Sequence, residues 1–92
     1  MNDYEMLPRE LQEARLRAGR SQRAAAELLG CTAQAISNWE RGYTRIDCIS
    51  LFRLLSWYGE DIYDFFRRCG LSAQDRPAGY GRVVQVPEKR AV

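Results

Sequence analysis

Hydrophobic residues recur three and four positions apart along most of this chain, and breakers such as glycine separate the runs. This spacing is typical of amphipathic helices, whose apolar side chains form a stripe on one face. It predicts five helices, over residues 8–18, 22–29, 33–41, 48–58 and 62–69. Five short helices in succession predict an all-α domain spanning residues 1–71.

The residues at the ends of these segments support the boundaries. A short polar side chain that can accept a backbone N–H precedes four of them: Ser21, Thr32, Asp47 and Asp61. Gly30 follows the second segment, where the chain needs a positive φ to turn back. Residues 21–42 therefore predict two short helices joined by a tight turn.

Two segments carry stripes of apolar residues that are expected to face the core of a small bundle. In the first segment the stripe is imperfect and consists of Leu11, Ala14, Leu16 and Ala18. In the fourth segment the residues recur at i, i+3, i+4 and i+7, and they are Cys48, Leu51, Phe52 and Leu55.

Beyond residue 71 the composition shifts to polar residues, prolines and glycines. Residues 72–92 are therefore predicted to form a short, mostly disordered tail. Residues 82–86 are the exception, because they hold three valines between breakers and suit a short strand.

Composition restricts the class of protein. With 92 residues the chain suits one small domain, and no apolar run is long enough for a membrane span. No secretory or transit signal is visible, which predicts a cytoplasmic location. Cys31, Cys48 and Cys69 lack CxxC spacing and are expected to be small buried residues. Without any histidine or Gly-rich phosphate loop, the sequence predicts no metal site, no cofactor and no enzymatic activity.

Charge is unevenly distributed, although the net charge is only +2. Residues 1–14 contain four acidic residues and one arginine, whereas residues 15–45 contain six arginines and two glutamates. The positive excess surrounds the two central helices, as a phosphate-facing surface requires. A solvated helix face could produce the same excess, so charge supports nucleic-acid binding without deciding it.

The third segment places Ile36 and Trp39 on one side and short polar side chains elsewhere. Such a helix suits contact with a polar, patterned surface, and DNA base edges are the leading candidate. Gln34 and Asn38 are four residues apart and share a face. Their amides match the donor and acceptor groups of adenine.

The motif in residues 22–42 resembles the helix-turn-helix of the phage-repressor and Cro family, also called the Xre family. The matching elements are Gln22, Ala25-Ala26, Leu29-Gly30, Cys31, Thr32, Ile36-Ser37, Trp39-Glu40 and Gly42. The similarity covers about residues 8–68, and it departs from the family at Ile46, where proline is frequent. It implies a lambda-repressor-like five-helix fold that binds double-stranded DNA.

The resemblance also implies a division of roles within the motif, with the third helix in the major groove. The residues that correspond to base contacts are Ala33, Gln34, Ser37 and Asn38. Those that correspond to phosphate contacts are Gln22, Thr32, Arg41, Tyr43, Thr44 and Arg45. Arg15 and Glu40 correspond to a buried pair between the first and third helices, a structural role that we favour over direct DNA contact.

Proteins with this motif usually bind palindromic sites as symmetric dimers, with half-site centres roughly 10 bp apart. The resemblance therefore implies a transcriptional repressor that acts as a homodimer: a phage or mobile-element regulator, a restriction-system controller or an antitoxin. Residues 62–69, which are rich in aromatic side chains, are the preferred dimer contact, and residues 82–86 are the second candidate. The tail and residues 62–69 are also candidate surfaces for a protein partner.

The competing interpretation is a protein-interaction module that keeps the fold without reading DNA. The polar residues Gln22, Thr32, Gln34 and Asn38 argue against it, because a repurposed surface has no need of them. Salt titration separates the two interpretations, since binding through phosphates weakens steeply as salt rises.

Overall fold

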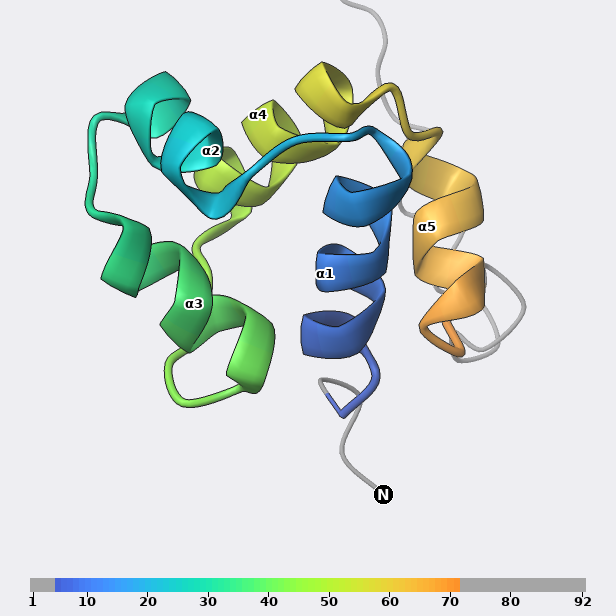
Figure 1. Ribbon diagram of the computed structural model, residues 1–92. Coiled ribbons are helices and arrows are strands. Elements are labelled where there is room, and N and C mark those ends of the chain that lie inside the picture. The colour runs from blue at the N-terminus through green and yellow to red at the C-terminus, as the bar shows by residue number, and fades with distance from the viewer. Residues whose placement is uncertain (1–4, 72–92) are drawn as a thin grey trace, which may run out of the picture.

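In a computed structural model of the protein, residues 5–71 are described and form five helices. They are α1 (Leu7–Arg17), α2 (Gln22–Leu29), α3 (Ala33–Arg41), α4 (Cys48–Tyr58) and α5 (Ile62–Arg68). α3 and α5 lie on opposite sides of α1 (Figure 1). The predicted five-helix, all-α architecture is confirmed, whereas the predicted tail and the strand at residues 82–86 lie outside the described residues.

Side-chain caps fix where four of the helices begin. The Ser21 and Thr32 hydroxyls accept backbone N–H groups of α2 and α3 at 3.0 and 3.1 Å. The carboxylates of Asp47 and Asp61 do the same for α4 and α5, at 2.9 and 3.0 Å. The bond from the Ser50 N–H lowers the pKa of Asp47, because it stabilises the charged carboxylate. All four predicted caps are confirmed.

The core draws one or more large side chains from every helix except α2. The largest fully buried residues are Leu11, Ile36, Leu54, Leu55 and Phe65. α2 instead buries Ala25 and Ala26. Their small side chains allow the backbone of α2 to approach its neighbours closely, which holds the α2–α3 unit against the rest of the domain.

The stripe predicted on α4 is only half right. The residues that α4 buries are Leu51, Leu54, Leu55 and Tyr58. Phe52 is 59% exposed and Cys48 is exposed as well. The helix is therefore rotated from the expected orientation, and part of the predicted stripe faces outward.

Two further burial expectations need correction. Leu16, assigned to the buried stripe of the first helix, is 59% exposed. Of the three cysteines, only Cys69 is buried, and this burial raises the pKa of its thiol to about 11. Cys31 is half-buried and Cys48 is exposed, so the expectation of buried thiols holds for one cysteine alone.

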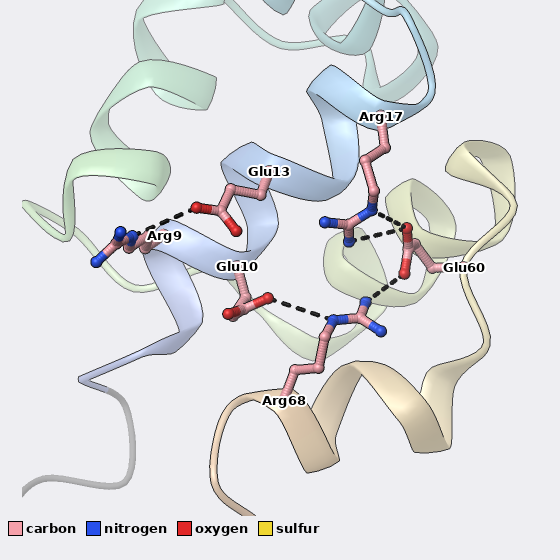
Figure 2. Close-up of polar contacts among 6 residues, drawn as sticks. All are labelled: Arg9, Glu10, Glu13, Arg17, Glu60 and Arg68. Atoms are coloured by element: carbon pink, nitrogen blue, oxygen red, sulfur yellow. Dashed lines mark hydrogen bonds and ion pairs between the residues drawn. The ribbon is translucent and has the colours of Figure 1, made fainter.

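A chain of ion pairs links α5 to α1. Glu60, in the turn before α5, accepts hydrogen bonds from Arg17 of α1 at 3.1 Å and from Arg68 of α5 (Figure 2). Arg68 also donates to Glu10 of α1 at 3.3 Å. Each of these partly exposed pairs contributes about 1 kcal/mol, and together they restrict how α5 sits on α1.

Candidate nucleic-acid interface

The turn between α2 and α3 consists of three residues and depends on one glycine. Gly30 adopts φ 72° and ψ 33°, a left-handed conformation that side-chain-bearing residues rarely adopt. A Cβ at this position would meet no atom within 4 Å, so the backbone conformation, not packing, requires glycine. The Cys31 N–H then closes the turn on the carbonyl of Ala26 at 3.0 Å.

α3 has distinct inner and outer sides. Ile36 and Glu40 are buried, and half-buried Trp39 packs against the core. The opposite side is exposed or half-exposed, and its residues are Ala33, Gln34, Ser37, Asn38 and Arg41. All four residues predicted to contact bases thus share one outward surface, which we call the α3 outer face.

Two amides on the α3 outer face are hydrogen-bonded to each other. Gln34 Nε2 donates to Asn38 Oδ1 at 3.0 Å. The prediction that these residues point the same way is confirmed. Gln34 is exposed and Asn38 is half-buried, so the amide of Gln34 is the more accessible of the two.

Five of the residues predicted to contact phosphate lie on α3 or next to it in sequence, and Arg41 belongs to the α3 outer face itself. Thr32 precedes α3, and its exposed hydroxyl caps the helix. The others lie at the end of α3 or in the loop that follows it, and all of them are exposed: Arg41, Tyr43, Thr44 and Arg45. The guanidinium of Arg41 lies 5.6 Å from the centre of the Tyr43 ring, an arrangement that holds its positive charge beside the helix.

Gln22, the sixth predicted phosphate contact, begins α2 and is half-buried. Its Nε2 donates to Glu40 Oε1 at 3.0 Å. An amide nitrogen has two N–H groups, so one is engaged by Glu40 and the other stays available as a donor. The buried carboxylate thereby fixes the direction of a side chain at the positive end of α2.

The buried pair that the resemblance implied is confirmed. Arg15 Nε and Nη2 donate to the two carboxylate oxygens of Glu40 at 2.8 and 3.1 Å. The hydrogen bond to Glu40 raises the pKa of Arg15. Arg15 Nη1 also donates to the carbonyl of Arg20 at 2.9 Å, so one guanidinium joins α1, α3 and the loop that leads into α2.

Two arginine contacts escaped sequence reasoning. Arg53 of α4 donates to the carbonyl of Leu28 at 3.0 Å and so satisfies a free carbonyl at the end of α2. Arg20 lies over the ring of Trp57, 4.2 Å from its centre. Both contacts join residues that are far apart in sequence, so no local sequence pattern predicts either of them.

An apolar groove lies between α4 and α5. Its volume is about 320 Å³ and its lining residues are Cys48, Ile49, Leu51, Phe52, Leu55, Ile62 and Phe66. Ile49 is 66% exposed and Tyr63, on α5, is 57% exposed. Sequence reasoning missed the groove, because it assigned Cys48 and Phe52 to the core.

Between residues 5 and 71, no three histidine, cysteine or acidic side chains gather in a way that could hold a metal ion. Over the same range, no helix combines the length and hydrophobicity that crossing a membrane requires.

Comparison with protein-family models finds a match to the family described as helix-turn-helix, over residues 11–65. The matched range covers more than half of the chain and includes α2, α3 and α4 entirely. A search of curated proteins found no significant match.

Proposed function

The chain belongs to the Xre/Cro-type helix-turn-helix family of DNA-binding transcription regulators, and on that premise we propose that it is a repressor that binds a palindromic operator as a homodimer. The observation that carries the proposal is the α3 outer face, where short polar side chains point outward from a helix supported by buried Ile36 and Glu40. Occupation of a promoter site excludes other proteins from it, so repression is the simplest consequence of binding.

In this proposal α3 enters the major groove with its N-terminal end first, and α2 lies across the backbone. Gln34 offers a donor and an acceptor that match adenine N7 and N6. Ala33 can make apolar contact with a thymine methyl group, and Ser37 can bond to a base edge or a phosphate.

Replacing Gln34 with alanine should weaken binding to the operator by about 1–3 kcal/mol and relax one base position. Binding to random DNA should change little, because the lost contact carries sequence information and not general affinity. Titration of both DNAs measures the difference. Gln12→Ala, which removes an exposed glutamine from α1, is the matched control. Equal losses on the two DNAs would remove Gln34 from base recognition.

Replacing Arg45 with alanine should instead weaken binding to every sequence alike. If Arg45 contacts a phosphate, the slope of log affinity against log salt should become shallower by about one. Arg9→Ala is the control, because it deletes an equally charged side chain that is 76% exposed on α1. A slope identical to that of the parent protein argues against a phosphate contact.

A dimer is proposed because one recognition helix contacts only a few base pairs. The apolar groove between α4 and α5 supports a self-association surface there, since its exposed residues Ile49 and Phe52 lose contact with water when a second copy covers them.

Phe52→Asp should raise the dimer dissociation constant at least tenfold, because burying a phenylalanine contributes about 1.5–3 kcal/mol. Sedimentation equilibrium measures the effect. Leu16→Asp is a close control, since Leu16 has the same exposed fraction on α1.

In the parent protein a short cysteine-reactive cross-linker should capture a dimer through Cys48, and Cys48→Ser should abolish that product. A parent protein that stays monomeric on its operator contradicts the proposed dimer.

The alternative function is a protein-interaction module that does not recognise DNA, and the salt dependence of binding tests it. Among the described residues, Gln34 and Arg41 on the α3 outer face are exposed, and exposed Arg45 follows the helix in sequence. These features support DNA over a protein partner. Binding that does not weaken as salt rises would favour the interaction module.

A further inference from the structure

We propose that Asn38 is a positioning residue for Gln34: it fixes the direction of the Gln34 amide so that one base position accepts adenine and rejects guanine. The inference rests on the proposed function of α3 as the recognition helix. It assigns to Asn38 an effect exerted through its neighbour in place of a base contact of its own.

The geometry places Asn38 behind Gln34. Gln34 lies in the first turn of α3, the end that enters the groove, and its side chain is exposed. Asn38 lies one turn further along and is half-buried. The backbone of Asn38 is also held, because its carbonyl accepts the N–H of Tyr43 at 2.9 Å in the turn that ends α3.

Hydrogen-bond chemistry explains how this arrangement orients Gln34. Gln34 Nε2 donates one N–H to Asn38 Oδ1 at 3.0 Å. Its second N–H and its carbonyl oxygen remain, which are the donor and acceptor that a bidentate contact to adenine N7 and N6 needs. Reversing the Gln34 amide alone would direct its oxygen at the oxygen of Asn38, two acceptors facing each other, so the two amides can reverse only together.

The same orientation discriminates against guanine. Guanine presents two acceptors, N7 and O6, in the major groove, so it is bound by a pair of donors. A glutamine held as Gln34 is held offers its carbonyl oxygen at one of those two places. Without Asn38 the amide is free to rotate, and the preference for adenine over guanine should decrease.

The experiment uses the full chain and a site selected by the parent protein from random DNA. Affinity is measured for that site and for every single-base variant of it. The proteins compared are the parent, Gln34→Ala, Asn38→Ala, the double variant and Asn38→Asp. Gln12→Ala, which removes an exposed glutamine from α1, serves as the control. Thermal unfolding verifies that each variant is folded.

Gln34→Ala and Asn38→Ala should relax the same adenine position, each lowering the preference for adenine over guanine by roughly 10-fold. The double variant should lose no more than Gln34→Ala alone, because the two residues act as one unit. Asn38→Asp keeps an acceptor for Gln34, so it should retain the preference while its added negative charge weakens binding to all sites.

Three results would overturn the inference. The first is that Asn38→Ala relaxes a different base position from Gln34→Ala. The second is that the losses of the two single variants add in the double variant. The third is that Asn38→Asp loses the preference for adenine. Failure of the underlying function has its own signature: Gln34→Ala then leaves every base position unchanged, which removes the assignment of α3 and this inference together.

Discussion

Glu40→Ala should lower the free energy of unfolding by about 3–5 kcal/mol, the cost of breaking a buried ion pair from one side. The side chains of Glu40 and Arg15 are only 1% and 9% exposed. Removing the carboxylate leaves the Arg15 guanidinium without its opposite charge in the interior. It also removes the acceptor for the Gln22 amide, so α1, α2 and α3 lose the side chain that connects them.

Urea denaturation of the full chain measures this loss. Glu13→Ala is the control, because Glu13 forms an ion pair with Arg9 on the surface of α1 and should cost at most about 1 kcal/mol. A loss for Glu40→Ala no larger than that of the control would show that the pair does not hold α1 and α3 together.

Phe65→Ala should cost about 3–5 kcal/mol, the usual range for deleting a buried phenylalanine ring. Phe65 is fully buried and stacks edge to face with Phe66, with ring centres 5.4 Å apart. It is the one fully buried side chain of α5, and Ile62 and Phe66 of the same helix are only partly buried against the core. Its removal should therefore loosen α5 and distort one wall of the apolar groove.

Tyr63→Ala provides the comparison within the same helix. Tyr63 is 57% exposed, so its truncation should change stability by no more than about 0.5 kcal/mol. Thermal and urea unfolding of both variants decide the matter. If the two substitutions destabilise the protein equally, α5 is not anchored in the core as the structure has it.

Local signals sufficed for the helices and for the α3 outer face. Caps such as Ser21 and Thr32 act on N–H groups three residues away, so the sequence itself carries the information. On α3 the apolar residues Ile36 and Trp39 share one side, so periodicity predicts that the opposite side faces outward, although it does not predict the burial of Glu40.

The orientation of α4 could not be assigned in this way. Its sequence, CISLFRLLSWY, is apolar on nearly every side, so periodicity allows several choices of buried face. Packing against the other helices selects Leu54 and Tyr58 and leaves Phe52 outside. The groove between α4 and α5 follows from this choice, which explains why sequence reasoning missed it.

Contacts between charged residues could not be predicted from local sequence patterns either. The Arg15–Glu40 pair was expected only from the family resemblance, because charged side chains at inward positions look like errors in an amphipathic pattern. The contact of Arg17 with Glu60 spans 43 positions in sequence and depends on how α1 meets the turn before α5. Such long-range contacts follow from the assembled fold and not from local sequence.

Selection of DNA sequence by the α3 outer face is tested most directly by recovering bound fragments from a random DNA pool with the 92-residue chain. We expect enrichment of two inverted half-sites with centres roughly 10 bp apart. Selection with Gln34→Ala should lose one conserved position in each half-site. Recovery of no preferred sequence by the folded parent protein would contradict the claim.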